Sequence, residues 1–342
     1  MKRVWSLLLC LAIILMLTLQ CSKKKDIHVM VNEFFQADTD VTILVTDSGL
    51  GGLSVAAELA ARLPQSGVFE NVRIIFYNSQ YHDYYGYNSL KNESEKVRIF
   101  DSALKAMKKS YHPDMLLIAC NTLSVLYDKT GFAQRANYPV IGIVELGVDL
   151  MEQEFERQPE ATVLIFATET TIGSGAHKKL LIERGIPAER IIGQSCPRLA
   201  GRIEEGPASE ETIGLITKYV GKALDKLGAE PVPIFASLNC THFGYSMQQF
   251  SDAFAAAGHA GIRIIDPNPS MAALLFKPEF MHRFPATNVS VEVVSKGKLG
   301  EKEINSISSL LEKTSPQTAD ALRRYEHRPD LFEAVFDSTM LK

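Results

Sequence analysis

Short runs of β-branched and other apolar residues alternate with helix-like stretches along most of the chain. This alternation is typical of parallel sheets that are covered by helices on both faces. The runs that we expect to be strands are 41–46, 72–77, 115–119, 140–144, 162–167, 190–192, 234–238 and 263–265. The stretches that we expect to be helices include 54–62, 93–109, 176–184 and 210–226. The sequence therefore predicts an α/β fold.

Length and charge restrict the class of protein further. The chain has 342 residues, 46% of them hydrophobic and 22% charged, which is enough to bury one large core or two modest ones. Its formal net charge of −4 gives no electrostatic reason to expect nucleic acid as a partner. The sequence contains no zinc-type cysteine pair and no low-complexity tract. These properties indicate an enzyme-sized protein without a predicted metal site.

The N-terminal segment resembles an export signal. Lys2 and Arg3 precede an uncharged apolar run over 4–19, an order typical of secretory signals. This run is slightly shorter than the roughly 20 residues of a comfortable transmembrane helix. Cys21 follows Thr18-Leu19-Gln20, which resembles a bacterial lipidation signal with Gln20 in place of the usual small residue. We expect lipidation at Cys21 and a membrane-anchored lipoprotein that faces the periplasm or the exterior. An uncleaved signal anchor is the alternative, and the protein is cytoplasmic if this segment is not a functional signal.

The chain is predicted to divide into five segments. Residues 1–21 form the signal, and residues 22–40 a polar, irregular tether, so that the folded part starts near residue 41. A first lobe is expected over 41–145 and a second lobe over 146–275. The C-terminal extension, 276–342, carries a predicted strand at 289–294 and helices near 301–313 and 317–325. We expect it to add a packed layer; a cover for the cleft, a cap on the second lobe and a homodimer contact are the alternatives.

The two predicted lobes share a pattern of strand ends. In the first lobe, one strand runs into Asp47-Ser48-Gly49 and a later strand into Cys120-Asn121-Thr122. In the second lobe, one strand runs into 168–171 and a later strand into Cys240-Thr241-His242. Ligand sites of open α/β sheets gather beyond the carboxyl ends of the strands. Two pseudo-symmetric parallel-sheet lobes that face a central cleft would therefore place one cysteine on either side of that cleft.

Cys120 and Cys240 have two interpretations. A single free cysteine is most often a small buried residue without chemistry. Here two cysteines occupy matched positions, and each is followed by polar residues that a core position does not explain. We therefore interpret both as candidate catalytic residues, and Cys196, which has no matched partner, as structural. His242 taken alone is more often structural, but two residues after Cys240 it can set the ionisation of that thiol.

Asp47 and the glycine-rich segment after it also have two interpretations. The first is a helix N-cap followed by a tight turn. The second is a strand-to-helix turn whose exposed backbone N–H groups hold a carboxylate. The segment matches neither a phosphate-binding P-loop nor a dinucleotide fingerprint.

Several short segments, taken together and in order, resemble a known family. They are similar to the glutamate racemase branch of the aspartate/glutamate racemase superfamily, over roughly residues 41–275. The matching segments are 47–53, Tyr85-Gly86, 119–122, 140–143, 167–175, Cys196-Pro197 with Glu204-Glu205-Gly206, and Cys240-Thr241-His242. The resemblance implies the fold of that superfamily, with two α/β lobes around a cleft.

The resemblance also implies an activity, the racemisation of an amino acid without a cofactor, with glutamate as the expected substrate. Cys120 and Cys240 would be the acid/base thiols, one removing the α-hydrogen from one face and the other returning it to the opposite face. Asp47 would assist Cys120, and His242 would assist Cys240 with Glu204 or Glu205 behind it. The expected substrate contacts are Ser48, Tyr85, Gly86, Asn121, Thr122, Thr171 and Thr241. Members of this branch supply D-glutamate for the peptidoglycan of the cell wall.

The chain departs from the family pattern at four places, none of which removes a proposed acid or base. The departures are Tyr84 and Leu146 where proline is usual, His177 where tyrosine is usual, and Phe243-Gly244 where Tyr-Pro is usual. Two facing thiols are exposed to oxidation in an oxidising compartment, which conflicts with the predicted export. Two alternatives therefore stay open: an aspartate or other amino-acid racemase of the superfamily, and a non-catalytic amino-acid-binding lipoprotein.

Overall fold

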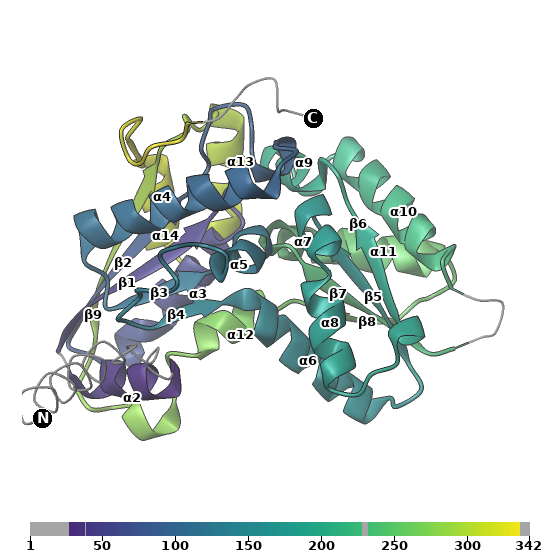
Figure 1. The fold of residues 1–342 in the computed structure, drawn as a ribbon, viewed down its shortest axis with the longest axis horizontal. Helices are drawn as coiled ribbons and strands as arrows, with labels where there is room; N and C mark the ends of the chain where they lie inside the picture. Colours follow the sequence, from purple (N-terminus) through teal and green to yellow (C-terminus); the bar gives the residue numbers. More distant parts are fainter. Residues whose placement is uncertain (1–26, 38, 228–231, 336–342) are drawn as a thin grey trace, which may run out of the picture.

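The structure, a computed structural model, describes residues 27–37, 39–227 and 232–335. Two parallel sheets, each covered by helices, form two lobes that lie side by side (Figure 1). All the strands expected from the sequence are present close to their predicted bounds, and the predicted α/β fold with two lobes is confirmed. The predicted signal, the lipidation motif and Cys21 lie outside the described residues.

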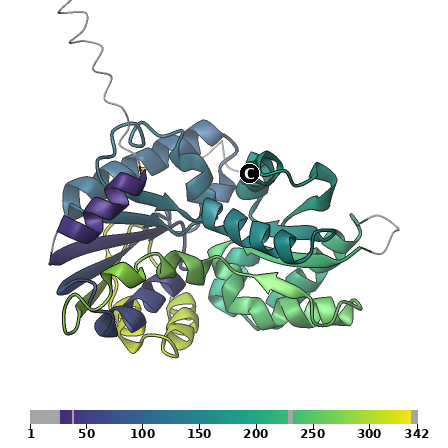
Figure 2. The ribbon, with the colours of Figure 1, turned by 90° about the horizontal axis from the view of Figure 1, so that it is seen from below.

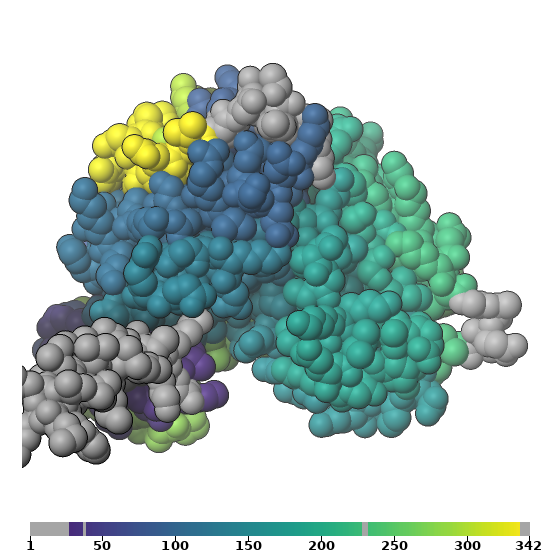
Figure 3. Space-filling view, in the orientation of Figure 1, coloured from purple at the N-terminus to yellow at the C-terminus, as the bar shows by residue number. Residues whose placement is uncertain are grey.

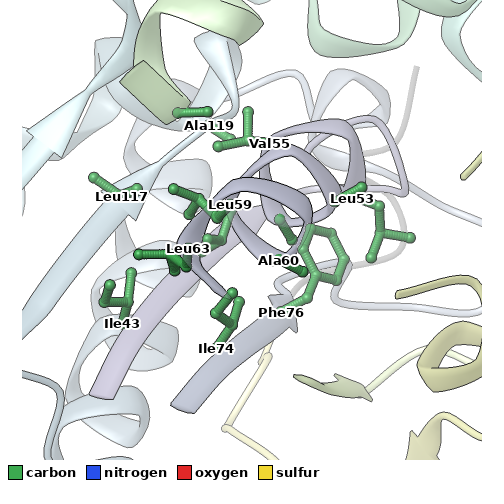
Figure 4. Packing of buried hydrophobic residues seen from close by; sticks show 14 of the residues in the cluster. Ile43, Leu53, Val55, Leu59, Ala60, Leu63, Ile74, Phe76, Leu117 and Ala119 are labelled. Atoms are coloured by element: carbon green, nitrogen blue, oxygen red, sulfur yellow. The ribbon is translucent and has the colours of Figure 1, made fainter. Parts of the chain in front are cut away.

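The first lobe is built on a six-stranded parallel sheet with the order β10-β9-β2-β1-β3-β4. Its strands are β1 (Asp40–Asp47), β2 (Asn71–Asn78), β3 (Met115–Ile118), β4 (Val140–Gly142), β9 (Asn288–Ser295) and β10 (Glu326–His327). Helices α4 (Glu93–Tyr111) and α5 (Asn121–Tyr127) cover one face. Helix α3 (Leu53–Arg62) covers the other face, where its apolar residues pack on Ile43, Ile74 and Leu117 (Figure 4).

The second lobe has a four-stranded parallel sheet with the order β6-β5-β7-β8. Its strands are β5 (Thr162–Ala167), β6 (Ile191–Ser195), β7 (Ile234–Asn239) and β8 (Arg263–Ile265). The helices on one face are α6 (Ile143–Arg157) and α8 (Ala176–Glu183). The helices on the other face are α9 (Leu199–Glu205), α10 (Glu210–Leu224) and α11 (Met247–Ala256). Because both faces are covered, the strands are nearly continuous apolar runs, and this made them easy to predict.

The segment before β1 differs from expectation. Residues predicted as an irregular tether instead form helix α2 (Ile27–Ala37). Phe34 and Phe35 of this helix are buried, and the ring of Phe35 stacks on Phe280 with a centroid distance of 4.6 Å. The tether prediction is therefore wrong for these residues, because two adjacent aromatic side chains attach the segment to the first lobe.

The C-terminal extension belongs to the first lobe. β9 pairs in parallel with β2 along its whole length, and helices α13 (Glu301–Leu311) and α14 (Pro316–Arg323) pack on the same face as α3. The extension is therefore a packed layer on the first lobe, and its helix α13 also contacts α9 of the second lobe. The view from below shows α12 (Asn268–Ala273) leading the chain from the second lobe back to the first (Figure 2). No helix of the described part of the chain is long and apolar enough to span a membrane.

Candidate active site

A cavity of about 680 Å³ lies where the two lobes meet, beyond the carboxyl ends of their strands. The first lobe contributes residues that follow β1 and β3, including Ser48 and Cys120. The second lobe contributes residues that follow β5 and β7, including Thr168 and Cys240. The space-filling view shows the first lobe, blue with the yellow C-terminal part, directly against the teal and green second lobe (Figure 3). The cavity is thus lined by Cys120 from the first lobe and by Cys240 from the second.

Cys120 is buried at the start of α5, immediately after β3. Its Sγ lies 3.2 Å from the Oγ of Ser48, within hydrogen-bonding distance for sulfur. Burial raises the pKa of the Cys120 thiol well above its ordinary value, and the nearby negative charge of Asp47 raises it further. Burial and Asp47 therefore favour the protonated form of Cys120.

Asp47 is fully buried, and its carboxylate accepts hydrogen bonds from backbone amides and not from the Cys120 thiol. Its Oδ1 accepts a hydrogen bond from the Ser48 amide at 2.6 Å, and its Oδ2 accepts one from the Gly52 amide at 2.6 Å. The hydroxyl of Thr241, in the other lobe, also donates to Oδ2 at 2.6 Å. Asp47 thus fixes the glycine turn and joins the two lobes, and it reaches Cys120 only through its charge.

Cys240 has a different neighbour, the imidazole of His242. The Nδ1 of His242 lies 3.6 Å from the Cys240 Sγ, and the Nε2 lies 2.6 Å from Oε1 of Glu204. Burial opposes a charge on this ring, but Glu204 and the Cys240 sulfur outweigh burial, so the pKa of His242 stands well above its ordinary value. The arrangement is a sulfur–imidazole–carboxylate chain across the cavity wall.

The glycine turn after Asp47 packs against this chain. The amide of Leu50 donates to Glu204 Oε1 at 2.7 Å, while the amide of Gly51 points at His242 Nε2 from 3.0 Å. A ring nitrogen has one in-plane position, so Nε2 either donates to Glu204 or accepts from Gly51. The raised pKa of His242 favours donation to Glu204. A Cβ at Gly51 would lie 2.6 Å from the backbone nitrogen of His242, so only glycine fits there.

Asn121 is the clearest candidate for a contact with a bound molecule. Its side chain lines the cavity and is 2% exposed, and neither its Oδ1 nor its Nδ2 has a hydrogen-bond partner in the described structure. Buried amides are rarely left without partners, because the lost hydrogen bonds with water are costly. A polar molecule in the cavity would satisfy both atoms.

The remaining predicted contacts divide into two groups. Thr122 and Thr241 line the cavity, and so does Gly86. Thr171 lies behind the wall, where its hydroxyl is 3.0 Å from that of Thr168 and 3.5 Å from that of Thr122. Tyr85 is 39% exposed and its ring packs on His82, so the structure does not bring it into the cavity.

Glu204, and not Glu205, stands behind His242. Glu205 accepts hydrogen bonds from Arg202 at 2.8 Å and from Lys302 at 3.2 Å. Lys302 comes from the C-terminal extension, and its neighbour Glu303 lines the cavity. The expectation that the extension only adds a packed layer therefore missed a contribution to the site.

Sequence reasoning also missed two residues after β6. Cys196 was interpreted as structural, yet it lines the cavity together with Arg198. The pKa of the Cys196 thiol is raised well above its ordinary value by burial and by the nearby Cys240. The position of Cys196 after a predicted strand was the available signal of a role in the site. It was read as structural because it has no matched cysteine in the first lobe. Within the described residues no group of three or more side chains is arranged to hold a metal ion.

Comparison with known proteins agrees with this geometry. Residues 43–275 match the family model described as Asp/Glu/Hydantoin racemase. A glutamate racemase of Nitratiruptor sp. is 31% identical over 231 residues, which cover 65% of this chain and 81% of that protein. A glutamate racemase of Lysinibacillus sphaericus is 29% identical over 205 residues, covering 60% of this chain and 70% of that protein.

Solved structures give the same fold. The glutamate racemase of Francisella tularensis, determined in complex with D-glutamate, superposes with a TM-score of 0.63 at 21% identity, covering 81% of this chain and 95% of that one. The glutamate racemase of Campylobacter jejuni superposes with a TM-score of 0.58 at 23% identity, covering 79% and 98%. Because the family model spans well over half of the residues, the chain belongs to the Asp/Glu/hydantoin racemase family and is an amino-acid racemase.

Proposed function

We propose that this racemase interconverts L- and D-glutamate with Cys120 and Cys240 as its two acid/base residues. One observation carries the proposal: a single cavity is lined by Cys120 from one lobe and Cys240 from the other, and each of these buried thiols has a different polar neighbour. Racemisation needs such a pair, because the α-hydrogen must leave from one face of the carbon and return to the other. The scheme requires no cofactor.

The two neighbours suggest the resting protonation states. Cys120 is a thiol, since burial and Asp47 disfavour its charged form. His242 carries a proton and a positive charge beside the Cys240 sulfur, an arrangement that stabilises a thiolate. In this state the Cys240 thiolate takes the α-hydrogen of one enantiomer, and the Cys120 thiol delivers its proton to the opposite face. The other enantiomer reacts by the reverse sequence, which restores both sulfurs.

The carbanion between these steps needs hydrogen-bond donors on the substrate carboxylate. Asn121, with both polar atoms unsatisfied, is the first candidate, and the hydroxyls of Ser48, Thr122 and Thr241 line the same cavity. Glutamate is favoured over aspartate because the relatives named above are glutamate racemases. Aspartate is the second substrate to test.

Solvent exchange tests the proposal directly. The reduced protein is incubated with L-glutamate in deuterated water, and both α-deuteration and loss of optical rotation are followed. We expect deuterium at the α-carbon together with D-glutamate. Absence of exchange with both glutamate and aspartate, in protein shown to be folded, would reject this substrate assignment.

We also propose that the chain is anchored to the bacterial cell envelope through a lipid on Cys21, which lies outside the described residues. The support is the order of basic residues, apolar run and cysteine in the first 21 positions. Cys21→Ala should release the protein from the membrane fraction. Unchanged retention would identify an uncleaved signal anchor instead.

A further inference from the structure

Arg198 stands where the chain leaves β6 and enters α9, two residues after Cys196. Its backbone is left-handed, with a φ of 66°, a conformation that residues other than glycine, asparagine and aspartate rarely adopt. Backbone strain of this kind gathers at functional sites. Arg198 is exposed and lines the cavity, so this backbone conformation lies at the edge of the substrate space.

The charge of Arg198 has no counterpart in the described residues. Two arginines line the cavity, and Arg202 is engaged by Glu205 at 2.8 Å and by Glu211 at 3.2 Å. The side chain of Arg198 makes no hydrogen bond or ion pair with the described residues, although carboxylates such as Glu169 and Glu303 also line the cavity. Of the two arginines that line the cavity, Arg198 is therefore the one whose guanidinium is available to bind an anion.

The distance from Arg198 to the thiols suits the side-chain carboxylate of an acidic amino acid. β6 and β7 lie on either side of β5. The end of β6, which precedes Arg198, is therefore about two strand spacings, roughly 10 Å, from the end of β7, which precedes Cys240. The reacting carbon sits at the thiols, and its side chain must cover part of that span. A side chain with a γ-carboxylate covers more of it than one with a β-carboxylate.

We propose that Arg198 binds the side-chain carboxylate of the substrate and selects glutamate over glutamine and aspartate. This inference rests on the proposed racemisation of an acidic amino acid. The guanidinium is a planar fork that pairs with a carboxylate through two parallel hydrogen bonds. Glutamine has the same shape without the charge, and aspartate is shorter by one methylene group.

The test compares Arg198→Met with Arg202→Met, which removes a neighbouring arginine that is already paired within the protein. Calorimetric binding of L-glutamate, L-glutamine and L-aspartate is measured on each full-length protein, together with α-hydrogen exchange. In Arg198→Met we expect the Kd and KM for L-glutamate to rise about 10- to 100-fold, the range of a lost charged hydrogen bond. Binding of L-glutamine should change less than about threefold, and Arg202→Met should keep the glutamate-to-glutamine ratio of the wild type.

The binding measurement needs no turnover, so it separates the two proposals. Loss of glutamate preference in Arg198→Met supports the role of Arg198 even if the wild type exchanges no hydrogen, a result that would remove the proposed racemisation alone. An active wild type whose preference survives in Arg198→Met overturns the role of Arg198 and leaves the racemisation intact. Equal affinity of the wild type for glutamate and glutamine also overturns it, as does an equal loss of preference in Arg202→Met.

Discussion

The two halves of the site share a backbone plan but not a chemistry. In each lobe a buried parallel strand ends just before a cysteine, and the next residues turn into helix. Around Cys120 the polar neighbour is the neutral hydroxyl of Ser48, and around Cys240 it is the imidazole of His242 backed by Glu204. A repeated strand-end frame thus fixes where the thiols are, while the side chains beside them differ.

In the proposed mechanism, this difference gives each thiol a starting role. On the Cys120 side, burial and the charge of Asp47 keep the thiol protonated. The Cys240 side stores a proton on His242. The lobes are also linked across the halves, because Thr241 donates to Asp47 and Leu50 donates to Glu204. A change on one side is therefore expected to reach the other side through contacts of this kind.

The largest effect is expected when either thiol is removed. Cys120→Ala and Cys240→Ala should each lower racemisation about a thousandfold or more, because one face then lacks its acid/base group. Each variant retains one thiol, so each should exchange the α-hydrogen of one enantiomer only, and the two variants should differ in which one. Proton exchange followed by NMR in deuterated water, started from pure L- or D-glutamate, measures this.

Cys196→Ala is the matched control, since Cys196 is a third buried thiol of the same cavity. It should retain racemisation within about tenfold, because no second face depends on it. If Cys196→Ala were as inactive as the other two variants, the assignment of only two acid/base thiols would be wrong.

Removing the imidazole of His242 should remove the chemical difference between the two halves of the site. His242→Asn should lower kcat/KM about 100-fold, the typical contribution of one positioned acid/base group. The loss must be equal in both directions, because two enantiomers have equal free energies. The asymmetry should instead appear in the isotope effect with α-deuterated substrate, which should increase only for the enantiomer that Cys240 deprotonates. Equal isotope effects for both enantiomers would argue against a role of His242 confined to Cys240.

Glu204→Gln should weaken the same side without removing the ring. Glu204 is a main cause of the raised pKa of His242 in the folded protein. The protonated imidazole therefore stabilises the fold fully at a pH below about 6.5, the ordinary pKa of histidine. This stabilisation is lost as the pH rises through the raised pKa of the folded state. In the variant that loss should start at lower pH. The alkaline limb of the kcat/KM profile should therefore move to lower pH, and activity at pH 8 should fall about tenfold.

Glu205→Gln is the control for this shift. Glu205 is adjacent in sequence but pairs with Arg202 and Lys302 instead of His242. Its removal should leave the alkaline limb in place. A shift of the limb in both variants would mean that the general negative charge of the wall, and not the contact with Glu204, controls His242.

The sequence predicts the strands and the thiols well because both follow local rules. A strand buried on both faces is an apolar run, and a polar residue at its end is visible without knowing the fold. Contacts between distant segments follow no local rule. Phe34 and Phe35 looked like part of a tether because nothing near them in sequence shows that Phe280 lies opposite.

The same limit applies to the site. Glu204 is 38 residues from His242, and only the packing of α9 against the turn at 241–246 selects it over Glu205. Arg198 and Glu303 also line the cavity, but their segments are not among the strand ends that the two lobes share in sequence. The hydrogen bond from Thr241 to Asp47 was equally out of reach, because it depends on how the two lobes meet.

The smallest effect is expected on the neutral side. Ser48→Ala removes the hydroxyl 3.2 Å from the Cys120 sulfur but leaves the Ser48 amide, which still donates to Asp47. A neutral hydrogen bond contributes about 1 kcal/mol, so kcat/KM should fall about fivefold. The hydroxyl lowers the pKa of Cys120, so its loss should raise that pKa further and leave less of the thiolate that takes the α-hydrogen on this side. Ser66→Ala, a buried serine remote from the cavity, serves as the control. A loss as large as that of His242→Asn would show that the hydroxyl, and not burial with Asp47, governs Cys120, and that the two halves are chemically closer than their neighbours suggest.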